Sequence, residues 1–244
     1  IFFFFLRFVN DHCKALLLEL EEHLIYIALE TDNPLSSAEL SFQVVQNNLK
    51  NLKQFIVKYK FKSIAEEIFF FKELKPTFCS KLFYHISIYN IETRKPSGGY
   101  KVIKKYLQNE LDKLKHYFDS NLDFYKYYRT GCNYLDHKYF VRGKHDIRLS
   151  LETFYFETDP KFSTSHDYKI SMILANDLLQ VYLEDGIMEL ERTAPKQKSE
   201  VSQKSDVLWT APKVALIELL YALHSEPTLN YGKAELRQIA VALE

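Results

Sequence analysis

The side chains in this sequence whose types and spacing suit metal or acid–base chemistry are three adjacent histidine–aspartate pairs. These pairs are Asp136-His137, His145-Asp146 and His166-Asp167, and Asp177 follows downstream. Imidazole and carboxylate groups together suit a catalytic divalent metal ion, and such ions activate water for phosphate-ester hydrolysis. One hypothesis is therefore a metal-dependent phosphohydrolase that uses His137, His145, His166 and the neighbouring aspartates.

The same residues also fit a structural role. His166 stands at the predicted N-terminus of a helix with Asp167 in the first turn, where a carboxylate interacts favourably with the helix dipole. The sequence has no GxSxG, P-loop, HExxH or dinucleotide-binding motif, and its 6 glycines leave few flexible ligand-binding loops. We therefore expect no catalytic residue, no metal site and no cofactor, and we expect that the protein is not an enzyme.

A second set of side chains could bind phosphate through positive charge. The whole chain balances 32 Lys plus Arg against 32 Asp plus Glu, yet residues 94–148 hold 13 basic and 6 acidic side chains. Lysines on one predicted helix contribute most to this excess and form a possible phosphate-contact surface: Lys101, Lys104, Lys105, Lys113 and Lys115. A solvated helix face on which lysine is the common surface residue explains the same excess.

The C-terminal stretch, residues 208–244, contains candidate DNA-contacting side chains. Thr210 can cap a helix that has Pro212 in its first turn, and a second amphipathic helix is predicted from about Lys233 to Leu243. The exposed donors on these helices, assigned to DNA binding, are Lys213, Lys233, Arg237 and Gln238. Two short helices need a third to close a core, so we expect an incomplete helix-turn-helix or winged-helix domain. A two-helix piece of any helical domain fits the same periodicity.

Helical periodicity dominates the elements that must position these side chains. The helices predicted from it cover residues 15–30, about 36–60, 64–91, 100–118 and 168–185. A serine at 36 or 37 is expected to cap the second helix, because Glu39 follows at capping-box distance. Pro76 is expected to kink or divide the third helix. Residues 147–157 instead change to alternating apolar and polar side chains, which predicts a strand.

These elements predict a mainly α protein with two parts. A large helical N-terminal domain with a short strand region covers residues 12–190, a polar linker covers 191–207, and the first part of a winged-helix-like domain covers 208–244. The linker has no aromatic residue and is rich in Lys, Ser, Gln and Glu, so it cannot bury enough apolar surface to order itself. Elsewhere, a total of 36 Phe and Tyr residues is ample for a core.

The cysteines and the N-terminal segment indicate the compartment. Cys13, Cys79 and Cys132 are far apart in the sequence and include no CxxC pair, which fits a reducing cytoplasm. The opening IFFFFL is apolar for only six residues, which is too short for a bilayer span, and it lacks the basic region and cleavage site of a signal peptide. We therefore expect a cytoplasmic protein that does not contact a membrane.

Four stretches of the sequence are similar to a known family. They are ELDKLKHYFDSNLDFYKYYR, YLDHKYFVRGKHDIRLSLETFYFETDP, KFSTSHDYKISMILANDLLQVYL and WTAPKVALIELLYALHS. They resemble RteC, a regulator carried on tetracycline-resistance conjugative transposons of Bacteroides-type bacteria, and the likeness runs from about Leu20 to Glu244. The resemblance implies a protein that binds double-stranded DNA upstream of the excision operon and activates its transcription. A winged-helix-like C-terminal region would provide the DNA binding.

The resemblance also implies a departure at the C-terminus. Family members continue past the residue that matches Glu244 into a basic segment that would include the recognition helix, so we expect the 244-residue chain to bind DNA weakly. The N-terminal domain is expected to serve regulation, RNA polymerase contact or self-association. A protein-interaction module that does not bind DNA is the remaining alternative.

Overall fold

The computed structural model describes residues 7–144, 159–193 and 211–226, together with Leu236 and Ile239. Within this part of the chain the structure is mainly helical and contains no strand. The predicted strand at residues 147–157 lies outside the described residues, so the expectation of a short strand region stays a prediction.

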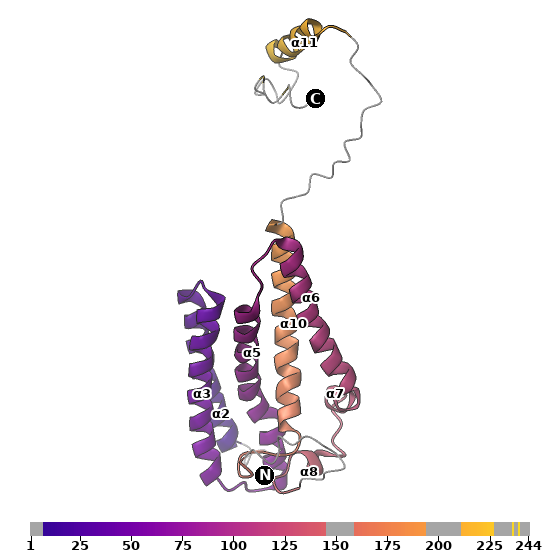
Figure 1. Cartoon of the computed structure of the whole chain (residues 1–244). Helices are drawn as coiled ribbons and strands as arrows, with labels where there is room; N and C mark the ends of the chain where they lie inside the picture. Colours follow the sequence, from indigo (N-terminus) through magenta and orange to yellow (C-terminus); the bar gives the residue numbers. More distant parts are fainter. Residues whose placement is uncertain (1–6, 145–158, 194–210, 227–235, 237–238, 240–244) are drawn as a thin grey trace. The chain divides into compact units, whose positions relative to one another are not determined.

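The chain divides into two compact units, residues 1–194 and residues 195–244, which are described separately (Figure 1). The division falls within the predicted linker, residues 191–207. Most of that linker lies outside the described residues, and its function as a linker stays a prediction. None of the described helices combines the length and the apolar character that a membrane span requires.

α2 (Arg7–Glu30) and α3 (Pro34–Lys58) begin unit 1 and pack against each other. Asn33 caps α3, because its side-chain oxygen accepts a hydrogen bond from the Leu35 backbone N–H at 2.9 Å. Pro34 takes the first helical position, where its missing N–H costs nothing. The prediction that Ser36 or Ser37 caps this helix is wrong. The helix starts earlier, at Pro34, and Asn33 is its N-cap.

A continuous helical run follows. It comprises α4 (Ile64–Phe69), the π-helical turn η1 (Phe70–Leu74) and α5 (Lys75–Arg94). In η1 the Lys75 backbone N–H donates to the carbonyl of Phe70, five residues earlier. Pro76 has no N–H, and in a regular α-helix its ring would clash with the carbonyl four residues earlier, so the wider turn accommodates it. Helical structure therefore continues through Pro76 with a π turn just before it.

The other helices that the structure describes in unit 1 are α6 (Tyr100–Ser120), α7 (Leu122–Arg129), α8 (Asp136–Tyr139) and α10 (Asp167–Thr193). α6 confirms the helix predicted over 100–118. α10 continues past the predicted end at residue 185 and enters the stretch that was assigned to the linker. Gly186 lies inside α10, where an added Cβ would stand 3.4 Å from Leu107 Cδ1 of α6, so α6 and α10 approach closely at this point.

Unit 1 is a bundle in which α5 lies between α3 and α10, and α6 packs on another side of α10 (Figure 1). Two clusters of buried side chains hold it together. The first contains the fully buried rings of Phe70, Phe71, Phe78 and Phe140. The second joins α5, α6 and α10 through Ile88, Ile91, Leu107, Leu179 and Leu183. Three of the seven Phe and Tyr residues of the predicted third helix, Phe70, Phe71 and Phe78, are therefore core residues, and burial of such large rings is strongly stabilising.

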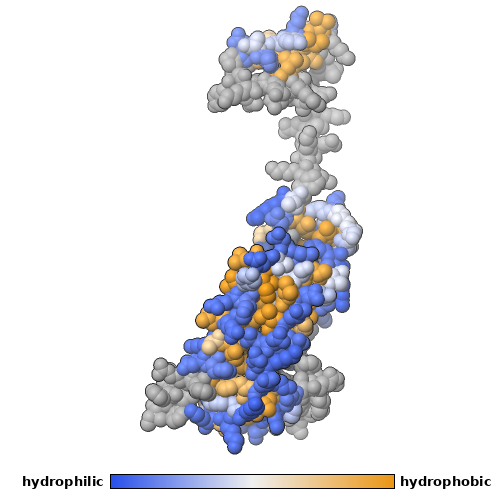
Figure 2. Space-filling view, turned by 90° about the vertical axis from the view of Figure 1, so that its left-hand side faces the viewer, coloured by the Kyte–Doolittle hydropathy of each residue, from blue (hydrophilic) through white to orange (hydrophobic). Residues whose placement is uncertain are grey.

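α2 also exposes large apolar side chains. Leu18, Ile25 and Leu29 are 61%, 61% and 78% exposed, and their spacing of seven and four residues places them on one face of the helix. Figure 2 views unit 1 from the side where α3 lies and shows orange apolar patches among the blue hydrophilic residues. Large exposed apolar patches are typical of surfaces that contact another protein.

Unit 2 contains α11 (Lys213–Ser225), which begins directly after Pro212. α11 is apolar around most of its circumference, with Val214, Ile217 and Tyr221 exposed. Leu236 and Ile239 are also helical, and Ile239 is buried. The rest of the predicted winged-helix region lies outside the described residues, so that domain assignment stays a prediction.

Candidate nucleic-acid interface

The candidate DNA-contacting residues of unit 2 fall mostly outside the described part of the chain. Lys213 is the first residue of α11, next to the helix N-terminus. Lys233, Arg237 and Gln238 lie outside the described residues. Backbone N–H groups at a helix N-terminus and a nearby lysine are both groups that contact DNA phosphates. The assignment of these four residues to DNA binding therefore stays a prediction.

α6 carries all the lysines predicted to form a phosphate-contact surface. Lys104 Nζ forms an ion pair with Glu191 of α10 at 2.7 Å, and Lys113 Nζ pairs with Glu110 at 2.5 Å. The remaining three lysines, Lys101, Lys105 and Lys115, are at least partly exposed. The surface is thus divided between lysines that have a carboxylate partner and lysines that are available to an external anion.

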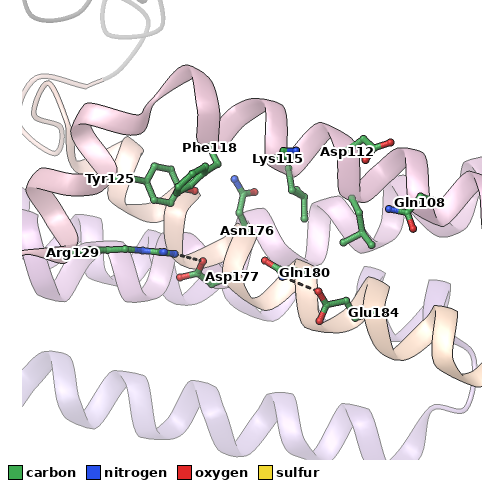
Figure 3. Close-up of a pocket in the computed structure, with 12 residues that line it drawn as sticks. Gln108, Asp112, Lys115, Phe118, Tyr125, Arg129, Asn176, Asp177, Gln180 and Glu184 are labelled. Atoms are coloured by element: carbon green, nitrogen blue, oxygen red, sulfur yellow. Dashed lines mark hydrogen bonds and ion pairs between the residues drawn. The ribbon is translucent and has the colours of Figure 1, made fainter.

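The charge excess of residues 94–148 meets opposite charge in the folded chain. Besides the pair from Lys104 to α10, the Arg129 guanidinium of α7 donates to Asp177 of α10 at 3.0 Å (Figure 3). Residues 149–207 hold 11 acidic and 6 basic side chains, and α10 lies in that segment. The basic and acidic segments are therefore neighbours in space, which weakens the long-range field that either would have alone.

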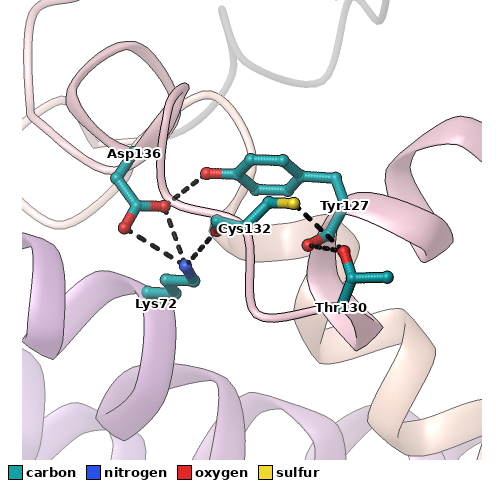
Figure 4. A network of polar contacts seen from close by, with 5 residues as sticks. All are labelled: Lys72, Tyr127, Thr130, Cys132 and Asp136. Carbon is teal, nitrogen blue, oxygen red and sulfur yellow. Dashed lines mark hydrogen bonds and ion pairs between the residues drawn. The ribbon is translucent and has the colours of Figure 1, made fainter.

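Two aspartates of the histidine–aspartate pairs, Asp136 and Asp167, form ion pairs with lysines that were not among the candidate residues, and Asp146 lies outside the described residues. Lys72 Nζ lies 2.8 Å and 3.1 Å from the two carboxylate oxygens of Asp136, and it also donates to the Cys132 carbonyl at 2.9 Å (Figure 4). The Tyr127 hydroxyl donates to the same carboxylate. Burial and the hydrogen bond to Asp136 raise the pKa of Tyr127 above its usual range, so this hydroxyl keeps its proton.

Asp167 forms a second, deeper pair with Lys75. Both side chains are buried, and Lys75 Nζ also donates to the Phe162 carbonyl at 2.6 Å. The Lys75 ammonium stands 4.5 Å from the centre of the Phe162 ring. The Thr164 backbone N–H donates to the other oxygen of Asp167 at 3.3 Å. Asp167 is in the first turn of α10, as predicted, and its charge is balanced inside the protein.

The histidines of these pairs are not brought together around a metal site in the described residues. His137 is exposed on α8, and His145 lies outside the described residues. His166 is buried, with its ring stacked on Tyr139 at 3.7 Å between centroids, and Ser165 Oγ lies 2.9 Å from its Nδ1. Among the described residues, no group of three His, Cys, Asp or Glu side chains is placed to hold a metal ion. In these pairs, His166 packs against Tyr139, and Asp136 and Asp167 are ion-paired with lysines.

The sequence did contain a signal for the two missed lysines. Lys72 and Lys75 interrupt a run of aromatic and apolar residues from Ile68 to Phe78. A lysine in such a run has to be paired when the run is buried, because an unpaired buried charge is costly. The signal does not say which carboxylate is the partner, since Asp136 is 64 residues from Lys72 and Asp167 is 92 residues from Lys75.

Comparison with known proteins gave a family assignment. No curated protein and no solved structure matches the chain. One family model, described as RteC protein, matches residues 69–244, which is more than half of the chain. The match begins near η1 and includes α5, α6, α10 and α11, whereas α2 and α3 precede it, so it is shorter than the resemblance from Leu20. The chain belongs to the RteC protein family.

Proposed function

We propose that this protein regulates the excision of a conjugative transposon by binding double-stranded DNA upstream of the excision genes and activating their transcription. The observation that carries the proposal is the family match over residues 69–244. Such a regulator acts in the cytoplasm, where the DNA is, and needs no cofactor. DNA binding belongs to unit 2, and unit 1 provides contacts with other proteins.

The character of α11 supports a DNA-binding role for unit 2. A helix that is apolar on most sides requires other helices to cover it, and helix-turn-helix domains bury their first helix in this way. Leu236 and Ile239 are helical in the segment where the second helix was predicted. Lys213 and the later donors Lys233, Arg237 and Gln238 are assigned to phosphate and base contacts.

Fluorescence anisotropy tests the proposal. The whole gene product is titrated with a labelled duplex from upstream of the excision genes and with a shuffled duplex, at several salt concentrations. We expect tighter binding to the first duplex and a Kd that rises steeply with salt. Equal affinity for the two duplexes, or no binding to either, would overturn the proposal.

The exposed lysines of α6 receive a separate test in the same assay. If Lys101 and Lys105 bind phosphates, changing both to Gln lowers the slope of log Kd against log salt by about one for each lysine that no longer binds a phosphate. Lys113→Gln is the matched control, because Lys113 is already paired with Glu110 on the same helix. An unchanged slope in the double variant would exclude DNA contact by these two lysines.

The exposed apolar face of α2 supports a protein-contact role for unit 1. Leu18, Ile25 and Leu29 form a stripe of the kind that helices bury against a partner. Self-association and RNA polymerase contact are the two forms of this role. Light scattering after size-exclusion chromatography distinguishes them, since self-association gives a mass that rises with protein concentration and is reduced by Ile25→Glu. A monomer at every concentration would leave polymerase contact as the proposed role.

A further inference from the structure

α3 lies at the edge of unit 1, where it packs on α2 and α5 (Figure 1). Residues 40–65, which include most of this helix, hold five lysines and no Asp or Glu, although the whole sequence has 32 basic and 32 acidic residues. The surfaces of soluble proteins usually intersperse both signs of charge. The family match begins at residue 69, so it gives α3 no role.

Hydrogen-bond donors line the side of α3 that faces away from the core. The buried positions of the helix are Ala38, Ser41, Val45, Asn48, Leu52 and Ile56. On the other side, amides and lysines are exposed: Gln43, Gln46, Asn47, Lys50, Asn51, Gln54 and Lys58. Steps of three and four residues place most of them in one stripe along the helix. At a rise of 1.5 Å per residue, the stripe over residues 43–58 is about 22 Å long.

The lysines of this stripe are largely free of partners inside the described part of the chain. Lys50 and Lys58 are exposed and form no ion pair with a described residue. Lys53, on the flank of the stripe, pairs with Asp159 at 2.9 Å. The exposed amides likewise make no side-chain hydrogen bond to a described residue. These donors are therefore available to acceptors from another molecule.

The neighbouring helix α2 keeps most of its carboxylates away from the lysines of α3. The rings of His12 and Phe55 lie 4.0 Å apart between centroids, so the first half of α2 lies beside the lysine-bearing half of α3. That half of α2 contains one carboxylate, Asp11, together with Lys14. The other four carboxylates of α2 lie within residues 19–30. The adjoining halves of the two helices therefore have an excess of positive charge.

A linear array of ammonium and amide donors suits the phosphates of nucleic acid. Phosphate oxygens accept hydrogen bonds, and Lys, Asn and Gln side chains are among the groups that contact them in protein–DNA complexes. Duplex DNA presents about one negative charge per 1.7 Å of its axis, so an array of this length can meet several phosphates. Binding to a membrane surface would require large apolar side chains beside the lysines. Within residues 43–58, α3 exposes none.

We propose that the exposed face of α3 binds the phosphate backbone of double-stranded DNA. Lys50 and Lys58 bind phosphates through their charge, and Gln46 and Gln54 donate hydrogen bonds to phosphate oxygens. The contact is independent of base sequence, because phosphates are the same at every position. The inference rests on the proposed function and adds a DNA contact in unit 1 to the contacts proposed for unit 2.

Fluorescence anisotropy of the whole gene product tests this contact with the upstream and shuffled duplexes at several salt concentrations. Lys50→Gln combined with Lys58→Gln should lower the slope of log Kd against log salt by about two for both duplexes. Lys126→Gln combined with Lys138→Gln is the matched control, because it removes the same charge from exposed lysines of α7 and α8. The control should keep the wild-type slope. An equal loss of slope in the two double variants would reflect net charge alone and overturn the proposal.

A second variant tests the amides without removing a lysine. Gln46→Glu combined with Gln54→Glu places two carboxylates on the stripe, and repulsion from the phosphates should weaken binding to both duplexes about tenfold or more at low salt. Gln and Glu have similar helix propensities, so we expect the helix to persist. Circular dichroism and thermal melting confirm that each variant is folded. Wild-type affinity in this folded variant would contradict the assignment of the α3 face.

The same titrations separate failure of this contact from failure of the proposed function. A clear preference for the upstream duplex, with wild-type slopes in the α3 variants, would overturn the α3 contact and leave the proposed function intact. Equal wild-type affinity for the two duplexes, with lower slopes in the α3 lysine variant, would overturn sequence-specific regulation and leave the α3 contact intact. No binding to either duplex would overturn both.

Discussion

Cationic and acidic side chains meet in two regions of unit 1, and the two regions differ in solvent access. At the end of the bundle that contains η1, Lys75 and Asp167 form a pair whose side chains are 9% and 3% exposed. Along α6 and α10, the pair between Lys104 and Glu191 is 39% and 49% exposed. The same residue types therefore have different roles. Burial, which the sequence does not state directly, distinguishes a structural charge from one that is available to a ligand.

Buried and exposed ion pairs have different roles because their charges are hydrated to different extents. A buried charge loses its water, so removing its partner leaves a group that the interior cannot stabilise. An exposed charge is solvated whether or not it has a partner, and salt screens the interaction. Asp136 and Asp167 with their lysine partners belong to the first situation, and the lysines of α6 belong to the second.

Lys75→Met should give the largest effect, because it leaves Asp167 buried without its cation. We expect a loss of about 3–5 kcal/mol in the free energy of unfolding, measured by urea denaturation. The double variant Lys75→Met with Asp167→Leu should recover much of this loss, since both charges are then removed. Lys113→Met is the exposed control. If Lys75→Met and Lys113→Met destabilised the protein equally, burial would not distinguish the charges of the two regions.

His85 on α5 is a partly buried ionisable group that lies near a cation. Burial and the nearby Lys81 lower the pKa of His85 to about 4 from an ordinary value of 6.5. Between these values the unfolded chain binds a proton that the folded chain does not, so stability falls as pH decreases from 6.5 toward 4.

For His85, the expected loss between about pH 7 and about pH 5 is at most about 2 kcal/mol. Denaturation curves at several pH values measure it. His85→Asn removes this contribution and should flatten the pH dependence by that amount relative to the wild type. An identical pH profile in the variant would show that His85 is protonated as readily in the folded chain as in the unfolded one.

Tyr127→Phe should have a smaller effect at the end of the bundle that contains η1. The variant removes one hydrogen bond to Asp136, while Lys72 still neutralises the carboxylate. We expect about 1 kcal/mol of destabilisation by urea denaturation. Tyr134→Phe is the control, because Tyr134 is an exposed residue in the same segment. A loss as large as that of Lys72→Met, which removes the ammonium paired with Asp136, would mean that the hydroxyl is as important a partner of this carboxylate as the ammonium.

Lys104→Met should have the smallest effect. Its pair with Glu191 is exposed, so we expect a change too small to resolve by denaturation at physiological salt. Thermal melting at low and high salt measures both the change and its salt dependence. A large loss that does not respond to salt would mean that the α6–α10 contact behaves like the buried pairs.

Long amphipathic helices were predictable because their core contacts repeat within one segment. The apolar steps from Tyr100 to Phe118 identified α6, and the RteC resemblance was carried by continuous stretches of sequence. Local rules were less decisive at helix starts. The second helix was predicted from about residue 36, whereas Asn33 caps it and Pro34 is its first residue, because the same residue types both stop and start helices.

Contacts between distant segments were not predictable in the same way. Lys72 and Asp136 meet because η1 and α8 converge at one end of the bundle, and no spacing rule connects residues 64 positions apart. A groove between α6, α7 and α10, lined by Phe118, Arg129 and Asn176 among others, depends on how α6 diverges from α10 beyond the close approach of Leu107 and Gly186. Its individual residues, taken one at a time, look like ordinary surface and core positions.

The π turn at Phe70–Leu74 makes the bundle sensitive to insertions and deletions in this segment. One residue more or less in a helix rotates everything beyond it by about 100°. Loss of a single residue from η1 would turn α4 relative to α5, and Lys72 and Lys75 would then no longer both face their aspartates. The turn therefore fixes the rotation of α4 relative to α5 about the helix axis. We expect related sequences to keep the length of this segment constant, whereas the lengths of loops elsewhere can vary.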